Sequence, residues 1–192
     1  MLAPWLFPFT GLVYIREMPG SLQPDYFLKS SRLAFRTWTM ADAPLALSLW
    51  GNPEVTQSLG GPFSESQVLE RLAREIANQL TYKLQYWPIF LQAGGAFVGC
   101  CGLHPYNLEK QMFELGYHLC PQYWGKGFAT EAAQAAISYA FGTLGLSGIY
   151  AGHHPGNDNS KRILEKVGFR YIHDEIYPPT GLMNPLYFLT RP

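Results

Sequence analysis

The chain has 192 residues, enough for one domain with a buried core, and 47% of them are hydrophobic. Its 14 basic and 14 acidic side chains cancel, so bulk charge gives no reason to expect nucleic acid or a membrane surface as a partner. The three cysteines, Cys100, Cys101 and Cys120, form no CxxC pair. Their odd number and apolar surroundings indicate reduced thiols in a cytoplasmic protein and argue against a zinc site.

The chain is expected to consist of an N-terminal arm, residues 1–30, and a single domain at residues 31–192. The arm is apolar enough to imitate a signal peptide. It lacks a basic beginning, however, and Pro4 and Pro8 interrupt what would be its apolar helix. No stretch of the sequence reaches the roughly 18 uninterrupted apolar residues that a membrane span requires.

Aromatic residues cluster in the arm: Trp5, Phe7 and Phe9 lie within a few residues of one another. Left in water, they would form one costly apolar patch. We therefore expect the arm to pack against its own domain or against a second subunit. The enrichment of aromatic residues in interface cores favours the second option, a homodimer.

Two capping signals predict helices in the first half of the domain. Thr39 and Asp42 have the spacing of a capping box and would open a short helix that runs to Leu49. Ser64 and Gln67 repeat this spacing before a longer helix. Apolar residues at one-turn spacing define its expected buried face: Val68, Leu72, Ile76 and Leu80. The acidic residues of this region are expected at solvent-facing helix positions: Asp42, Glu54, Glu65, Glu70 and Glu75.

Alternating and apolar runs predict the strands, which are expected at residues 33–38, 87–91, 96–103, 111–119, 147–151, 171–177 and 186–189. The second and third are joined by the hairpin signal Gly94-Gly95. Two further helices are expected, one rich in alanine after residue 128 and one at residues 157–167. Hairpins early in the chain and strand-helix-strand units later predict an α/β (α+β) fold, a mixed sheet with helices on both faces.

The loop after residue 119 has the composition of an anion site. Gln122, Gly125 and Gly127 have the spacing Q-x-x-G-x-G. The two glycines let successive amides converge on a phosphate at the start of the next helix, and Lys126 adds a charge. The phosphate loop of nucleoside triphosphate-binding proteins and the dinucleotide-binding pattern are both excluded, the latter because Thr130 stands where it needs glycine.

This loop resembles the acetyl-CoA loop, [QR]-x-x-G-x-[GA], of the Gcn5-related N-acetyltransferases (GNAT). A second family signature, N-x-x-S followed by L-x-K-x-G-F, is present as Asn157, Ser160, Leu164, Lys166, Gly168 and Phe169. Two signatures in the right order make chance agreement improbable. The resemblance covers residues 33–189. It is to the RimJ/RimL-type group, which acetylates the N-terminal amines of ribosomal proteins, together with its small-molecule relatives.

The resemblance implies a mixed, mostly antiparallel central sheet and acetyl-CoA as the cosubstrate. We expect the pyrophosphate to contact Gln122 and the amides of Tyr123, Trp124, Gly125, Lys126, Gly127, Phe128 and Ala129. The backbone of Leu119 would pair with the pantetheine amide as an added strand. The resemblance also places Asn157 on the pantetheine arm and Ser160 near the sulfur, as the acid for the thiolate.

Other interpretations of the second signature stay open. Asn157 is a good N-cap and Ser160 fits a first helical turn without any catalytic purpose. Lys161 and Arg162 would either meet the CoA phosphates or form a solvated face.

Acetyl transfer to an amine needs a neutral amine, a stabilised oxyanion and a proton for the departing thiolate. Glu114 is the first candidate for the base, because it lies on the strand that leads into the loop and partial burial would raise its pKa. The alternative is a solvated glutamate at a sheet edge. His118 points to the same face and is the second candidate. Positioning alone is a third option, since it supplies much of such an acceleration.

Two other groups of reactive side chains are set aside. Cys120 is close to the expected thioester, but no adjacent base would activate it, which argues against a covalent acyl-enzyme. His153 and His154 lack a third ligand, so no metal site is expected.

The sequence therefore predicts a cytoplasmic N-acetyltransferase in which a primary amine attacks the acetyl-CoA thioester directly. The acceptor would be a peptide N-terminus or a small-molecule amine. No nucleic acid or membrane is expected as a partner. The alternative is a CoA-binding regulatory module without catalysis, against which Glu114 argues.

Overall fold

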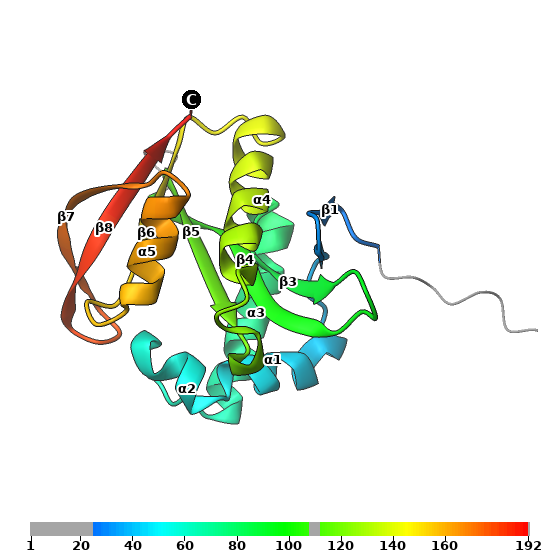
Figure 1. Cartoon of the computed structure of the whole chain (residues 1–192). Helices are drawn as coiled ribbons and strands as arrows, with labels where there is room; N and C mark the ends of the chain where they lie inside the picture. Colours follow the sequence, from blue (N-terminus) through cyan, green and yellow to red (C-terminus); the bar gives the residue numbers. More distant parts are fainter. Residues whose placement is uncertain (1–24, 108–111, 192) are drawn as a thin grey trace, which may run out of the picture.

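The computed structural model describes residues 25–107 and 112–191. Eight strands form one sheet in the order β1-β2-β3-β4-β5-β6-β8-β7 (Figure 1). They are β1 (Leu28–Lys29), β2 (Leu33–Phe35), β3 (Tyr86–Leu91), β4 (Phe97–Asn107), β5 (Met112–Leu119), β6 (Gly148–Gly152), β7 (Arg170–Tyr177) and β8 (Leu182–Thr190). Every neighbouring pair is antiparallel except β5 and β6. The predicted mixed, mostly antiparallel sheet is confirmed.

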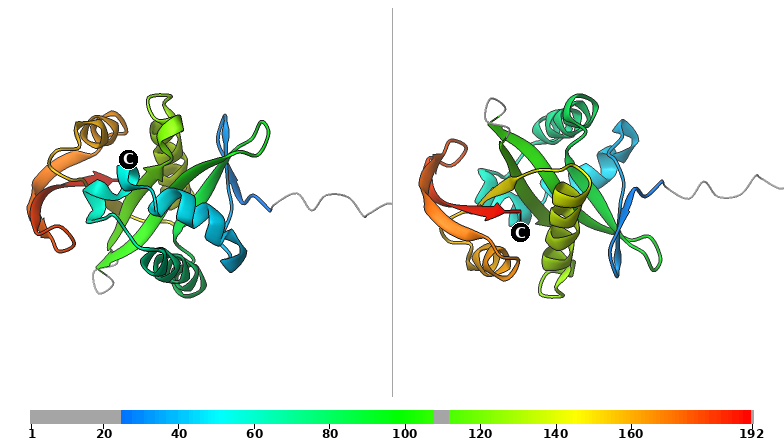
Figure 2. Two further views of the ribbon diagram at one scale, coloured as in Figure 1. Left: turned by 90° about the horizontal axis from the view of Figure 1, so that it is seen from below. Right: turned by 90° about the horizontal axis from the view of Figure 1, so that it is seen from above.

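Helices cover both faces of this sheet (Figure 2). They are α1 (Ala43–Trp50), α2 (Pro53–Thr56), α3 (Glu65–Tyr82), α4 (Phe128–Gly142) and α5 (Asp158–Lys166), with short 3-10 turns at Met40–Asp42, Gln57–Leu59 and Pro121–Tyr123. None of the helices in the described ranges is long and apolar enough to cross a membrane.

Both predicted capping boxes are confirmed. The Thr39 amide donates to Asp42 Oδ2 at 2.8 Å, before the 3-10 turn that leads into α1. The Ser64 amide donates to Gln67 Oε1 at 2.8 Å at the start of α3. Asp42 is not solvent-facing as predicted: it is 7% exposed, because Arg36 forms an ion pair with it at 2.6 Å.

Helix α3 corrects two further predictions. Leu80 was expected on the buried face and is 71% exposed, whereas Glu75 was expected in solvent and is 1% exposed. The reason is the helical period: a spacing of four residues drifts by roughly 40° per step, so Leu80 lies about 120° away from Val68. Glu75 lies within about 20° of Val68 and therefore faces the sheet.

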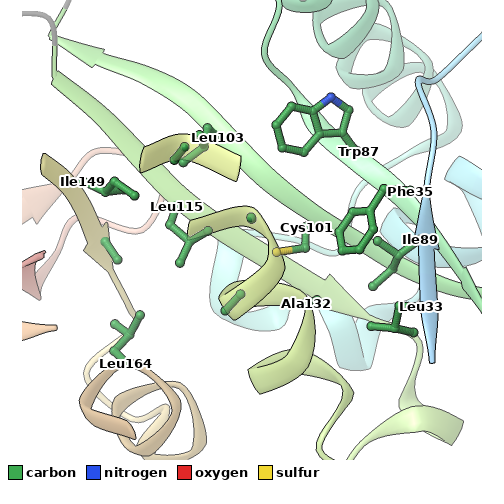
Figure 3. Close-up of a cluster of buried hydrophobic side chains, with 14 of the residues drawn as sticks. Leu33, Phe35, Trp87, Ile89, Cys101, Leu103, Leu115, Ala132, Ile149 and Leu164 are labelled. Carbon is green, nitrogen blue, oxygen red and sulfur yellow. The ribbon is translucent and has the colours of Figure 1, made fainter. Parts of the chain in front are cut away.

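One core lies between the sheet and helices α4 and α5 (Figure 3). Its members include Leu33, Phe35, Trp87, Ile89, Cys101, Leu103, Leu115, Ala132, Ile149 and Leu164. Ala132, Ala133, Ala136 and Ala140 are fully buried on α4, so this helix lies close to the sheet. A second core lies on the opposite face, against α1 and α3, and includes Trp38, Leu49, Trp50, Val68, Leu72, Tyr86, Cys100 and Cys120.

Strand β5 divides its side chains between the two cores. Leu115 and Leu119 belong to the core under α4 and α5. Gly116 and Cys120 lie on the opposite face of the strand. Cys120 belongs to the second core, and a Cβ atom on Gly116 would lie 2.3 Å from the Tyr86 ring. Because side chains alternate along a strand, Glu114 and His118 face α1–α3.

Strands β5 and β6 separate after a single pairing. Glu114 and Tyr150 are their one paired position in the described part of the chain. In Figure 1 the two strands meet near one end and then diverge. The edge of β5 after Glu114 is therefore left without a partner strand on the β6 side.

Residues just before the domain already belong to the sheet. Leu28 and Lys29 pair with β2, and the Phe27 ring packs 5.2 Å from that of Trp87 and 5.4 Å from that of Tyr139. The aromatic cluster of the arm lies outside the described residues. Its packing, like the domain boundary at residue 30, stays a prediction.

Candidate active site

A cleft of about 800 Å³ follows β5 from the start of α4 to β7 and β8. Its lining includes Leu115, Tyr117 and Leu119 from one face of β5 and Glu114 and His118 from the other. The cleft therefore reaches both faces of the sheet where β5 and β6 diverge. We call the α4–α5 side the loop side and the α1–α3 side the helix α3 side.

The loop side has the backbone geometry of an anion site. Gly125 and Gly127 have φ angles of 71° and 79°, which glycine adopts freely. Gly127 caps α4, and its carbonyl accepts the first helical hydrogen bond from the Glu131 amide at 3.1 Å. The preceding amides of the helix, from Phe128 to Thr130, have no carbonyl one turn earlier to bind and lie in the cleft lining. They suit a phosphate at the positive end of α4.

Arg32 contacts both this loop and the first turn of α4, a role that the sequence pattern did not reveal. Its Nε lies 2.7 Å from Glu131 Oε2, and its Nη1 donates to the Lys126 carbonyl at 3.2 Å. The guanidinium carbon lies 4.2 Å from the centre of the Phe128 ring. The loop is thus tied to the first turn of α4 by a residue from the beginning of the domain.

Most of the predicted CoA residues line the cleft: Leu119, Tyr123, Trp124, Gly125, Gly127, Phe128, Ala129, Asn157 and Ser160. Gln122 and Lys126 are exposed and are not part of the lining. Lys126 Nζ instead donates to the Gln122 carbonyl at 2.7 Å. The Leu119 carbonyl, expected to pair with pantetheine, already accepts a hydrogen bond from Trp124 Nε1 at 2.8 Å. A carbonyl oxygen has a second lone pair for a ligand.

Helix α5 contributes the wall opposite the loop. Asn157 is its N-cap, and its Oδ1 accepts from the Ser160 amide at 3.0 Å. Ser160 Oγ lies 2.9 Å from the hydroxyl of Tyr117. Burial raises the pKa of Tyr117 above its ordinary value, so this hydroxyl keeps its proton at neutral pH. Strand alternation from Glu114 could have placed Tyr117 on the loop side.

Lys161 and Arg162, two of the three basic residues of α5, line different cavities. Arg162 lines the main cleft. Lys161 lines a separate cavity of about 310 Å³, together with His153 and Asp158. Of these two residues only Arg162 is placed to meet a ligand in the main cleft, and Lys166 at the end of α5 also lines it.

Glu114 lies at the one position where β5 pairs with β6. Burial raises its pKa from 4.5 to about 7, His104 opposes the rise, and Glu175 adds to it. The Gly152 amide donates a hydrogen bond to its carboxylate. A carboxylate with a pKa near 7 can take up and release protons under neutral conditions.

A second carboxylate supports this arrangement. His104 is the cross-strand partner of Glu114, and its Nε2 lies 2.7 Å from Glu75 Oε2 on α3. The other neighbour of His104 is Tyr86, whose ring stacks on the imidazole at 3.6 Å between centres. Glu75 also accepts a hydrogen bond from the Tyr86 amide at 2.8 Å. These three residues form the wall next to Glu114.

His118, the second candidate base, is differently placed. Its Nδ1 lies 3.4 Å from Trp50 Nε1 and 3.6 Å from Cys100 Sγ. Burial lowers its pKa well below the ordinary value, and Arg71 and His104 lower it further. A neutral imidazole so reluctant to accept a proton is a weaker base than Glu114.

The cysteines and the adjacent histidines show no catalytic arrangement. Cys120 is 4% exposed, and burial raises the pKa of its thiol, which disfavours the reactive thiolate. His153 Nδ1 lies 2.8 Å from the His154 carbonyl, and His154 Nδ1 accepts from the Gly156 amide at 3.0 Å. Within residues 25–107 and 112–191, no three His, Cys, Asp or Glu side chains are grouped to hold a metal ion.

The family described as the acetyltransferase (GNAT) domain matches residues 32–170. The chain belongs to this family. It is therefore an acetyl-CoA-dependent N-acetyltransferase, in agreement with the sequence signatures. An uncharacterized N-acetyltransferase, p20, from Bacillus licheniformis is 33% identical over 147 residues, which are 74% of this chain and 82% of p20.

Solved structures share the fold. The acetyltransferase from Agrobacterium tumefaciens superposes with a TM-score of 0.74 at 26% identity, over 85% of this chain and 94% of its own. RimL, a ribosomal L7/L12 α-N-protein acetyltransferase in complex with coenzyme A, gives a TM-score of 0.72 at 17% identity, over 84% of this chain and 95% of RimL. The RimL likeness is one of fold.

Proposed function

We propose that the acceptor amine enters from the helix α3 side of the cleft and that Glu114 removes its proton. The position of Glu114 in the cleft lining, where β5 pairs with β6, is the observation that carries this proposal, and burial that raises its pKa to about 7 supports it. Its carboxylate faces α1–α3, while the phosphate-binding amides of α4 lie on the loop side. The two substrates would thus meet through the gap between β5 and β6, with the base on the acceptor's side.

On the loop side, the amides from Phe128 to Thr130 would hold the CoA phosphates. The free edge of β5 near Leu119 and the cleft-lining Asn157 would hold the pantetheine arm. Acetyl-CoA supplies the activated thioester carbon, and its sulfur leaves as the new amide bond forms. Holding that carbon beside the amine is itself a large part of the acceleration.

The hydroxyl pair of Ser160 and Tyr117 is the proposed source of the proton for the leaving sulfur. The two oxygens are 2.9 Å apart, and Tyr117 stays protonated at neutral pH because burial raises its pKa. Ser160 can donate to the sulfur while Tyr117 replaces its proton, or Tyr117 can donate directly, and in both routes the tyrosinate regains a proton from solvent as CoA leaves. Both routes keep Ser160 as part of the proposed acid and add Tyr117 as a second proton donor.

Two acceptor classes remain compatible with this chemistry. RimL is named for acetylating a ribosomal protein at its N-terminus, and the present chain would act in the same way if a peptide enters the helix α3 side. A small-molecule amine fits the same reaction. A cytoplasmic location and a homodimer remain proposals from the sequence.

The test is acetyl-CoA consumption against a panel of amines and N-terminal peptides, with Glu114→Gln as the variant. Turnover by the parent protein is expected, with kcat reduced about 100- to 10,000-fold in the variant and the KM for acetyl-CoA unchanged. Glu70→Gln on the exposed face of α3 is the matched control. If CoA binds but no amine is acetylated, the chain is the non-catalytic CoA-binding module instead.

A further inference from the structure

Arg71 is a cationic side chain of the cleft without an anionic partner among the described residues. It extends from α3, and its guanidinium carbon lies 4.8 Å from the centre of the Trp50 ring. Its Nε is buried and has no hydrogen-bond partner in the described part of the chain. Arg71 also lines the cleft. Buried donors in native proteins are nearly always paired, so an unpaired guanidinium nitrogen at a cleft wall indicates that a ligand supplies the acceptor.

A second polar atom on the same cleft also lacks a partner. Asn184 on β8 is 9% exposed, and its Oδ1 is buried without a hydrogen bond to any described residue. Asn184 lies opposite Glu175 in the β7–β8 pairing, and both residues line the cleft. The cleft thus offers one unpaired donor, on Arg71, and one unpaired acceptor, on Asn184.

The position of Arg71 separates it from the CoA site. Trp50, on which it stacks, belongs to the core between the sheet and α1–α3. The phosphate-binding amides of α4 lie on the other face, with the sheet between them and Arg71. Arg71 therefore lies on the helix α3 side, where the proposed function brings the acceptor, and away from the amides proposed to bind the CoA phosphates.

Arg71 and the candidate base share the same surroundings. Tyr86 and Tyr177 both line the cleft. Burial is the main cause that raises the pKa of each tyrosine; Glu114 raises it further and Arg71 lowers it. The positive and the negative group thus lie within electrostatic range of the same two rings. Arg71 and Glu114 also line the same cleft, which makes this cleft suitable for a ligand that carries both an anion and an amine.

We propose that the acceptor is a small amine that also carries a carboxylate, as an α-amino acid does. Arg71 binds the carboxylate, and Asn184 Oδ1 accepts a hydrogen bond from the amine that Glu114 deprotonates. The planar guanidinium matches a carboxylate geometrically. This inference rests on the proposed function, because it uses Glu114 as the base.

The test compares the common L-α-amino acids with two sets of analogues, their carboxamides and the amines that lack the carboxyl group. Acetylation is expected to have the highest kcat/KM for a carboxylated amine. Arg71→Gln should raise the KM for that acceptor about 10- to 100-fold, since a charge-assisted hydrogen bond is lost. The same variant should leave the KM values for the carboxamide and for acetyl-CoA unchanged.

Two further variants separate charge recognition from stability. Arg74→Gln removes an exposed arginine from the same helix and should change neither KM. Arg71→Lys keeps the charge without the planar fork and should recover part of the loss. The inference is overturned if peptides or carboxylate-free amines are the better substrates, or if Arg71→Gln alters all acceptors equally.

Calorimetric titration of the carboxylated amine into the CoA-bound protein distinguishes this inference from the proposed function. Binding that depends on Arg71 in a protein that acetylates nothing would support the anion site and contradict catalysis. Equal binding by the parent and Arg71→Gln proteins, with turnover intact, would overturn the anion site and leave catalysis standing.

Discussion

His104 Nε2 lies 2.7 Å from Oε2 of Glu75, a carboxylate that is 1% exposed on the sheet-facing side of α3. The same imidazole is the cross-strand partner of Glu114, whose pKa it lowers. Glu75 thereby fixes His104 beside the candidate base. The pKa of Glu114 near 7 is a balance: burial raises it and this imidazole restrains it.

His104→Asn should shift the pH dependence of catalysis. Removal of the imidazole takes away the group that lowers the Glu114 pKa, so this pKa rises above about 7. Because Glu114 must be ionised to act as the base, the acidic limb of the kcat/KM profile moves to higher pH. The KM for acetyl-CoA should stay unchanged, since His104 lies on the helix α3 side. An acidic limb that does not move would show that His104 does not act on the base.

Glu114→Gln should stabilise the protein at high pH only. The carboxyl has a pKa of 4.5 when unfolded and about 7 when folded, so the folded state binds the proton more tightly. The stabilisation of the folded state by the protonated carboxyl is fully present below pH 4.5 and is lost as the pH rises through 7. Above pH 7 the ionised, partly buried carboxylate costs up to about 3 kcal/mol.

The variant removes this cost, so its melting temperature should exceed the parent's by several degrees at pH 8 and match it near pH 4.5. Calorimetry at the two pH values measures the difference. Glu70→Gln, exposed on α3, should show no pH-dependent gain. An equal effect of Glu114→Gln at both pH values would contradict the raised pKa.

Gly127→Ala should weaken CoA binding by more than its effect on folding. A residue other than glycine at a φ of 79° costs about 1–2 kcal/mol of stability. Gly145→Ala, at a φ of 69° outside the cleft lining, introduces the same strain and is the matched control. Both variants should lose similar stability, while only Gly127→Ala raises the Kd for CoA in a calorimetric titration. Equal CoA affinities in the two variants would show that the loop is not part of the CoA site.

Local chemistry in the sequence was enough to predict the helix starts and the turn through Gly125 and Gly127. A capping box involves residues three apart, and the loop with Gly125 and Gly127 is contiguous with its helix. Strand β1, with two residues, and helix α2, with four, were too short to produce a periodic signal. The divergence of β5 from β6 was not predictable either, because it depends on pairing between segments distant in the chain.

The helix α3 side of the cleft illustrates the same limit. Arg71, His104 and Asn184 come from three elements, α3, β4 and β8, and no local spacing connects them. Glu75 is different, since a strict 3.6-residue period from Val68 and Leu72 would have placed it on the buried face. Tyr117 likewise follows from strand alternation once Glu114 is assigned to the opposite face.

Tyr117→Phe and Ser160→Ala together should identify the acid that protonates the leaving sulfur. The two hydroxyls are 2.9 Å apart, and Tyr117 is the better proton donor because a phenol is more acidic than an alcohol, even though burial raises the pKa of Tyr117. We expect Tyr117→Phe to lower kcat about 100-fold or more and Ser160→Ala to lower it less, because Tyr117 can still donate directly. Single-turnover kinetics separates the chemical step from product release.

Tyr82→Phe, at the exposed end of α3, is the matched control and should leave kcat unchanged. A larger loss in Ser160→Ala than in Tyr117→Phe would make Ser160 the immediate acid and Tyr117 its supporting hydroxyl. If both variants keep the parent kcat with CoA bound normally, the sulfur leaves without a proton from the protein. In that case the hydroxyl pair serves only to hold α5 against β5.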